Sequence, residues 1–142
     1  AAEKLGIGII ETGENNASVY REDMPAADRI LCDVPCSGLG VIAKKPDIKY
    51  KNREDIERLP SLQKKILETS ARYLRVGGTL VYSTCTLSPA ENKNIVSAFL
   101  SENADFELCT FRAGGAECAG MLELIPGETT DGFFIAKMKK VK

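Results

Sequence analysis

The sequence predicts an α/β fold whose sheet is mostly parallel, with an antiparallel hairpin at its C-terminal end. Arg29–Asp33 contains three consecutive apolar residues followed by an acid, which is typical of a buried parallel strand. Helical spacing then leads to the β-rich run Thr79–Ser83, so strand, crossover helix and strand should form a right-handed βαβ unit. The strand candidates Phe106–Cys109 and Phe133–Ala136 should end the sheet as an antiparallel pair.

The N-terminal residues predict one short strand in mostly polar surroundings. Ala1–Gly6 lacks an initiator Met and is typical of the end of a helix, so we expect residues 1–142 to form a single partial domain. Ile7–Ile10 is an apolar run that follows Gly6, a residue type that commonly ends helices, and it indicates a strand. The polar segment Glu11–Asp28 is expected to be a loop.

Two helices are predicted further along the chain. From Ser61 the apolar residues fall at helical spacing, and Gly77–Gly78 is expected to end that segment. Ser88–Glu91 offers an N-cap serine, a proline at the first helical position and a glutamate placed for a capping box, which predicts a helix through Leu100. Arg112–Asp131 is rich in glycine and is predicted to be an irregular linker.

The composition narrows the class of protein. A chain of 142 residues that is 44% hydrophobic and 27% charged is expected to be one soluble globular domain. No apolar run approaches the ~18 residues of a membrane span and no leader is evident, so we expect a cytoplasmic protein without a membrane partner. The net charge of -1 indicates that any nucleic-acid contact must be local.

The cysteines and the lack of histidine limit the chemistry. Five cysteines form no paired disulfide framework, so we interpret them as reduced thiols. The sequence has no histidine, which excludes serine-histidine and cysteine-histidine hydrolases.

Two cysteines lie where a predicted parallel strand ends. The segments are Asp33–Gly40, which contains Cys36, and Tyr82–Thr86, which contains Cys85. Ligands of α/β sheets bind at the carboxyl ends of the strands, so both thiols should face one crevice. A free cysteine is more often a small apolar core residue, and that is our interpretation of Cys32, Cys109 and Cys118. Turn-forming and polar neighbours favour a chemical role for the other two.

These segments resemble a known family. Asp33–Gly40 and Ser83–Thr86 resemble the two signature motifs of the Sun/Fmu-type (RsmB-like) RNA 5-methylcytosine methyltransferases. Lys45–Tyr50 resembles the segment that follows the first motif in bacterial ribosomal members, and Glu91–Asn92 and Asp131–Lys137 look like later blocks of that family.

The resemblance implies a fold and a cofactor. It covers about residues 28 to 137 and implies the C-terminal half of a Rossmann-like S-adenosylmethionine-dependent methyltransferase sheet, without the N-terminal cofactor-binding half. Family members place their first strand of this region across other strands from Asp33, so we expect Ile7–Ile10 to be displaced or re-paired. Asp33 and Pro35 are the implied cofactor contacts, and the isolated chain is expected to be inactive.

The resemblance also implies the reaction and the substrate. Cys85 would bond covalently to carbon 6 of a cytosine in 16S ribosomal RNA, Cys36 would assist release of the methylated base, and Asp33 would contact that base. A thiolate suits this chemistry because its adduct makes carbon 5 nucleophilic toward a sulfonium methyl group. A helix opening near Pro89 could activate Cys85. The alternative for Asp33 is a carboxylate that caps the Pro35 turn.

A basic stretch next to the first motif is the expected RNA contact. It comprises Lys44, Lys45, Lys49, Lys51 and Arg53, with Tyr50 among them for stacking. We expect Pro35, Ser37, Lys45, Lys49 and Tyr50 to bind substrate. The alternative is an ordinary solvated loop.

Other classes of protein remain as alternatives. Amine-directed nucleic-acid methyltransferases place an aromatic residue at this strand end, where the chain has Cys36. A non-enzymatic zinc- or RNA-binding module could use Cys32, Cys36 and Cys85, but histidine and CxxC spacing are missing, so no metal is expected. An exposed sheet edge would favour self-association.

Overall fold

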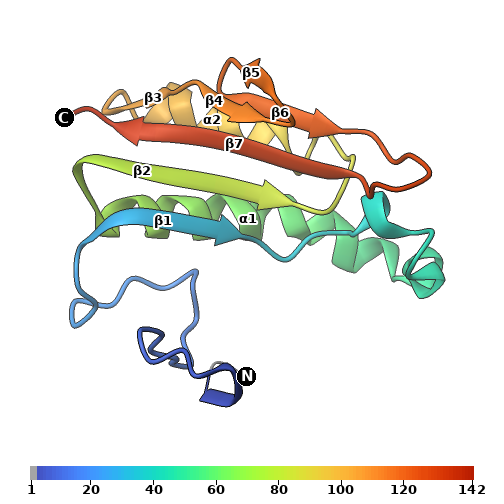
Figure 1. Ribbon diagram of the computed structural model, residues 1–142, viewed down its shortest axis with the longest axis horizontal. Helices are drawn as coiled ribbons and strands as arrows, with labels where there is room; N and C mark the ends of the chain where they lie inside the picture. The colour runs from blue at the N-terminus through green and yellow to red at the C-terminus, as the bar shows by residue number, and fades with distance from the viewer. Residues whose placement is uncertain (1–2) are drawn as a thin grey trace.

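The computed structural model describes residues 3–142 as a sheet with helices on one of its faces (Figure 1). The larger sheet contains β1 (Ala27–Asp33), β2 (Leu74–Thr84), β7 (Phe133–Lys140), β3 (Phe106–Leu108) and β6 (Met121–Leu124). Its order is β1-β2-β7-β3, with β6 also paired to β7. A second sheet pairs β4 (Phe111–Ala113) with β5 (Ala116–Cys118). The helices are α1 (Arg53–Tyr73) and α2 (Lys93–Glu102), with 3₁₀ turns at Glu3–Leu5, Leu39–Val41 and Pro46–Tyr50.

The pairing of the central strands confirms the predicted βαβ unit. β1 and β2 are parallel, with Asp33 opposite Ser83, and α1 connects them. β7 lies antiparallel to β2, and both β3 and β6 lie antiparallel to β7. Within residues 3–142 the larger sheet therefore has one parallel pairing, at the cysteine-bearing strands, and three antiparallel pairings toward the C-terminus. The α/β class with an antiparallel C-terminal end is confirmed.

The core lies between the sheet and the two helices. Leu67 of α1, Leu80 of β2, Phe99 of α2 and Met138 of β7 are fully buried there. Phe106 packs edge to face on Phe99, with ring centroids 5.0 Å apart. Burial of these apolar side chains holds the strands and helices together. The loops that follow β1 and β2 are therefore attached to a packed core.

The first helix begins earlier and ends earlier than predicted. α1 starts at Arg53 rather than Ser61, because the Asn52 side chain accepts a hydrogen bond from the Glu54 N–H at 3.0 Å and caps the helix. It runs through Pro60 and ends at Tyr73. Gly77–Gly78 lies within β2 instead of ending the helix, and the chain passes directly from helix to strand.

The predicted N-terminal strand is wrong. Ile7–Ile10 is not a strand, and Ile9 is 94% exposed. A strand needs the edge of another strand, and this run forms no ladder with any strand of residues 3–142. The N-terminal segment instead contacts the end of α1, where Tyr20 stacks on Tyr73 at 4.8 Å and the Arg72 guanidinium lies 3.6 Å from the Tyr20 ring centroid. The expectation that the run is displaced from the sheet is met.

The segment Arg112–Asp131 is more regular than predicted. β4 and β5 pair across a tight turn at Gly114 and Gly115, whose φ angles are 56° and 83°. Those left-handed conformations are the ones that hairpin turns require and that glycine adopts without strain. The glycines that indicated a linker therefore make the turns between short strands.

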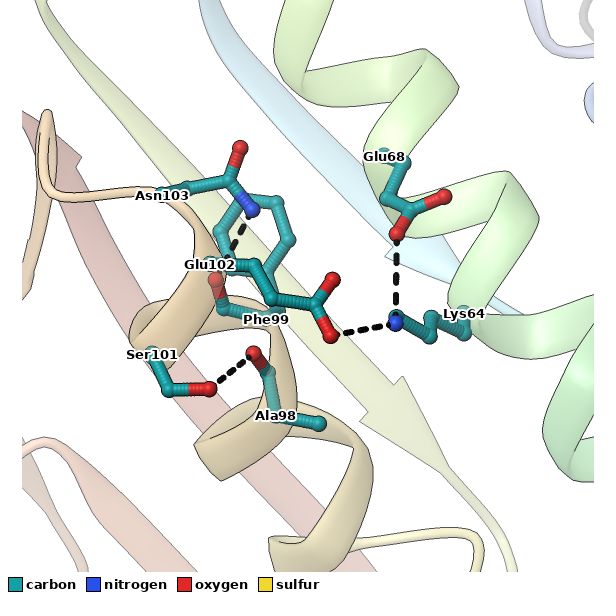
Figure 2. Close-up of polar contacts among 7 residues, drawn as sticks. All are labelled: Lys64, Glu68, Ala98, Phe99, Ser101, Glu102 and Asn103. Carbon is teal, nitrogen blue, oxygen red and sulfur yellow. Dashed lines mark hydrogen bonds and ion pairs between the residues drawn. The ribbon is translucent and has the colours of Figure 1, made fainter.

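Polar contacts join the two helices and end α2 (Figure 2). The Lys64 ammonium of α1 lies 2.7 Å from a Glu102 carboxylate oxygen of α2 and 3.6 Å from Glu68. The hydrogen bond with Glu102 is the main cause that raises the pKa of Lys64. At the end of α2, the Asn103 side-chain amide donates to the Phe99 carbonyl at 2.8 Å. These contacts join the C-terminal end of α2 to α1 and end the helix.

The first strand leaves one side of the sheet open. β1 pairs with β2 alone among the strands of the described chain, and Leu31 on β1 is 69% exposed. Self-association through this edge stays a prediction. No helix in residues 3–142 is long and apolar enough to cross a membrane.

Candidate active site

The two predicted cysteines meet where the parallel strands end. Because β1 and β2 run in the same direction with Asp33 opposite Ser83, the loops that follow them leave the sheet at the same edge. The Cys36 sulfur lies 3.1 Å from the Cys85 sulfur, and both thiols are free and half-buried. The prediction that the two thiols lie together is confirmed, and the crevice that they would face stays a prediction.

The surroundings of Cys36 favour its protonated form. Burial, the larger cause, and the hydrogen bond with Cys85 together raise the pKa of the Cys36 thiol to about 11. Burial disfavours the charged thiolate. At neutral pH Cys36 therefore remains a thiol, and it can donate its S–H to the Cys85 sulfur.

Hydrogen bonds tie the two cysteine loops together on both sides of the thiol pair. The hydroxyls of Ser37 and Thr86, which directly follow the cysteines, lie 2.7 Å apart. The Gly40 N–H donates to the Cys85 carbonyl at 3.0 Å, and the Gly132 N–H donates to the Gly40 carbonyl at 2.8 Å. These hydrogen bonds connect the two loops to each other and to the residue that precedes β7.

The buried carboxylate of Glu91 binds the loop that contains Cys36. Glu91 is 1% exposed, and its Oε2 accepts from the Ser37 N–H at 2.9 Å and from Gln63 Nε2 at 2.9 Å. Gln63 Nε2 also donates to the Pro35 carbonyl at 2.8 Å. The Tyr82 hydroxyl, whose pKa burial raises, donates to the Glu91 carbonyl at 2.6 Å.

This arrangement corrects the predicted capping box. α2 begins at Lys93, and Ser88–Glu91 forms turns before it. The Glu91 carboxylate does not cap a helix at Ser88 because it turns inward to the Ser37 N–H. The helix therefore opens later than the position proposed for activating Cys85.

The second loop is held by the neighbouring amide. Asn92 Oδ1 accepts from the Thr84 hydroxyl at 2.5 Å, and Asn92 Nδ2 donates to the Thr86 carbonyl at 2.9 Å. These partners lie directly before and after Cys85. Asn92 is 1% exposed, so the contacts are shielded from water.

Sequence reasoning assigned no role in the site to Gln63 or Asn92, and it gave Glu91 only the role of a helix cap. Gln63 is fully buried on α1, on the same side as Ile66 and Leu67. A polar residue within an apolar helix face was the available signal for it. Nothing in the spacing of Glu91 distinguished an inward carboxylate from a helix cap.

Asp33 and Pro35 lie exposed at the end of β1. The Asp33 carboxylate accepts from the Ser83 hydroxyl at 2.8 Å, a bond to the neighbouring strand rather than to the Pro35 turn. An exposed carboxylate at the carboxyl end of a parallel strand suits a cationic or hydrogen-bond-donating ligand group. These two residues therefore fit one side of the expected cofactor and base site.

The basic stretch lies beside the cysteine pair, but its members differ in what their side chains contact. Lys45, Lys49 and Tyr50 are exposed, with Tyr50 at 86%. Lys51 is exposed as well, but its ammonium donates to the carbonyls of Ser37 at 2.9 Å and Cys36 at 3.3 Å. Lys51 also lines a cavity of about 370 Å³ next to Cys36.

Ser37 does not fit the expectation of a substrate contact. Its side chain is fully buried, and its hydroxyl and N–H are both bonded within the protein. Ser37 supports the loop instead. The thiol of Cys32, also considered as a metal ligand, is buried in the core with its pKa raised by burial. No group of three potential metal-binding side chains occurs in residues 3–142.

Comparison with known proteins decides the family. Residues 2–139 match the family model described as 16S rRNA methyltransferase RsmB/F. The chain belongs to the RsmB/F family. A Bacillus subtilis (strain 168) protein named "Probable ribosomal RNA small subunit methyltransferase B" is 41% identical over 99% of this chain and 34% of its own length. The Escherichia coli (strain K12) ribosomal RNA small subunit methyltransferase B is 48% identical over 80% of this chain and 26% of its own length.

A solved structure supports the RsmB/F assignment and the fold. NSun6 from Pyrococcus horikoshii, crystallised with SFG, matches with a TM-score of 0.82 and 32% identity over 99% of this chain and 37% of that chain. The 142 residues thus span between 26% and 37% of the length of these three proteins.

Proposed function

We propose that this RsmB/F chain supplies the catalytic cysteines for transfer of a methyl group from S-adenosylmethionine to carbon 5 of a cytosine in 16S ribosomal RNA. The contact between the Cys36 and Cys85 sulfurs, 3.1 Å apart at the carboxyl ends of parallel strands, carries the proposal. The relatives named as small-subunit ribosomal RNA methyltransferases support the choice of substrate. The chain on its own is proposed to be inactive.

In the proposed mechanism Cys85 is the nucleophile. Its thiolate adds to carbon 6 of the flipped-out base, and the electron pair moves to carbon 5. Carbon 5 would then take the methyl group as its bond to the sulfonium sulfur breaks, leaving S-adenosylhomocysteine. Asp33 accepts a hydrogen bond from the polar edge of the base and favours its protonation, which makes carbon 6 more electrophilic. Loss of the carbon 5 proton to solvent lets the bond between Cys85 and carbon 6 break.

Cys36 is proposed to assist that last step. With its pKa raised to about 11 it holds its proton at neutral pH, so its S–H can donate to the Cys85 sulfur as that sulfur leaves the base as a thiolate. A hydrogen bond to a developing anion lowers the barrier to its formation. Cys36 therefore acts on release rather than on attack.

S-adenosylmethionine would supply an electrophilic methyl group beside the base. SFG, an analogue of this cofactor, is present in the structure of the NSun6 relative. Asp33 and Pro35 are the residues of this chain proposed to hold it, since both are exposed at the end of β1. Lys45, Lys49 and Tyr50 are proposed to contact the RNA backbone and a neighbouring base.

The test uses a hybrid protein in which residues 1–142 are joined to the upstream part of the Bacillus subtilis relative. The hybrid is incubated with S-adenosylmethionine and 16S ribosomal RNA, and covalent protein–RNA adducts are detected on a denaturing gel. We expect an adduct that accumulates in Cys36→Ala and is lost in Cys85→Ala. Methylation that survives in Cys85→Ala would overturn the proposal and favour amine-directed methylation.

A further inference from the structure

We propose that Glu91 and Gln63 are positioning residues for Cys36, and that the step they serve is release of the methylated base from Cys85. This inference rests on the proposed function. The inference adds two buried residues to the proposed function. They hold the backbone around Cys36 and touch neither sulfur.

The geometry is a clamp on the two peptide groups that flank Cys36. Gln63 Nε2 donates to the Pro35 carbonyl at 2.8 Å, which belongs to the peptide group before Cys36. Glu91 Oε2 accepts from the Ser37 N–H at 2.9 Å, which belongs to the peptide group after it. Gln63 and Glu91 also bond to each other at 2.9 Å, so the two halves of the clamp move together.

The burial of these side chains argues that they do more than pack. Gln63 is 0% exposed and Glu91 is 1% exposed, and one oxygen of each, Oε1, has no partner within residues 3–142. Burying a carboxylate and an amide with incomplete hydrogen bonding is unfavourable compared with an apolar side chain of similar volume. Their placement is explained by what their bonded atoms hold, which is the backbone on both sides of Cys36.

The Cys36 loop and the Cys85 loop are held by different side chains, and this difference identifies the reaction step that Glu91 and Gln63 serve. Glu91 and Gln63 contact the Cys36 loop, whereas Asn92 contacts the residues before and after Cys85. Loss of the Glu91 carboxylate should therefore shift the Cys36 sulfur and leave the nucleophile in place. An adduct would still form, but its breakdown would be slow. Asn92 provides the matched control, because its loss should disturb attack.

The first experiment uses the 142-residue chain itself and measures how often the Cys36 and Cys85 sulfurs meet. Diamide oxidises two adjacent thiols to a disulfide and is itself reduced to the hydrazide, so the rate of Cys36–Cys85 crosslinking, read by peptide mass spectrometry, reports how often the sulfurs meet. We expect Glu91→Ala and Gln63→Leu to slow crosslinking about tenfold, the size of one lost buried hydrogen bond to a charged group. Glu91→Gln keeps an acceptor for the Ser37 N–H and should restore most of the rate.

A control variant separates an effect on the position of Cys36 from a general loss of stability. Phe106→Leu removes buried volume at the end of the β2–β7 ladder that lies away from the thiols. Phe106 pairs with Lys140, next to the Thr79–Lys139 pair, whereas the cysteine loops follow the other end of the ladder. It should leave the crosslinking rate unchanged. Equal slowing in Phe106→Leu and Gln63→Leu would overturn the positioning role.

The second experiment identifies the step in the hybrid protein. With Cys36 intact, Glu91→Ala and Gln63→Leu should accumulate the covalent RNA adduct as Cys36→Ala does, whereas Asn92→Ala should form it slowly. Adduct formation slowed equally by Glu91→Ala and Asn92→Ala would overturn the inference. Absence of any adduct in the Cys36→Ala hybrid would overturn the proposed function, and the crosslinking result would still decide whether the clamp positions Cys36.

Discussion

The hydroxyl of Ser37 lies 2.7 Å from the hydroxyl of Thr86, and each residue directly follows one of the paired cysteines. Both side chains are fully buried. The bond therefore sets the spacing of the two loops next to the sulfurs, and removing either partner leaves the other hydroxyl buried without it.

Ser37→Ala is expected to lower the free energy of unfolding by about 1–3 kcal/mol, because the buried Thr86 hydroxyl then keeps only the Ser88 N–H, at 3.3 Å, as a partner. Thr86→Val should cost a similar amount for the same reason. The double variant should cost less than the sum of the two, since no hydroxyl is then left unpaired. Urea unfolding of the four proteins measures this coupling, and strictly additive losses would contradict it.

The Cys36 thiol is expected to react with iodoacetamide as a group with a pKa of about 11, because burial and the contact with Cys85 disfavour its thiolate. The rate at the Cys36 peptide, followed by mass spectrometry against pH, should rise with a midpoint near that value. The same chain in concentrated urea is the control and should show the ordinary midpoint of 9.0. A folded midpoint equal to the unfolded one would contradict the burial argument.

The same shift has a consequence for stability. The pKa of Cys36 is higher in the folded chain than its ordinary 9.0, so between pH 9.0 and about 11 the unfolded chain loses the proton first. The contribution of Cys36 is thus present below pH 9.0 and is lost as the pH rises toward 11. Cys36→Ala should make the free energy of unfolding fall less steeply over this interval.

Gly40→Ala is expected to destabilise the chain by about 1–3 kcal/mol through overpacking. A Cβ at this position would lie 2.9 Å from the Cys85 carbonyl oxygen and still closer to the Gly132 backbone, and neither backbone can move without separating the loops. Gly13→Ala is the control, because its Cβ would meet no atom within 4 Å. Thermal unfolding compares the two, and similar melting temperatures would count against the close approach.

Tyr50→Ala and Lys49→Ala are expected to weaken RNA binding in different ways. Tyr50 is 86% exposed and free to stack on a base, a contact that typically contributes about 1–3 kcal/mol. Loss of a phosphate contact at Lys49 should reduce the slope of log affinity against log salt by about 0.7. Fluorescence anisotropy with a single-stranded ribosomal RNA fragment measures both. Lys65→Ala, an exposed lysine of α1, should change neither.

The sequence alone determined the βαβ unit and the placing of both cysteines at one edge. Consecutive apolar residues before Asp33, helical spacing after Ser61 and the run Thr79–Ser83 are local patterns, and the geometry of parallel strands then requires that Cys36 and Cys85 meet. The resemblance of their motifs to one family could be recognised in the same way, and the match over residues 2–139 confirms it.

Only the tertiary structure decided which polar side chains turn inward. Glu91 has the spacing of a helix cap, yet its carboxylate bonds to Ser37, which is distant in the sequence. Lys51 sits in a basic stretch, yet its ammonium binds the carbonyls of the cysteine loop. Ile7–Ile10 has the composition of a strand but finds no strand edge in the described chain. The partners of Glu91 and Lys51 lie beyond the neighbouring residues, and the edge that Ile7–Ile10 would need is not offered by the described strands. Local propensity and spacing carry no information about either, so the packed arrangement of strands and loops settles the outcome.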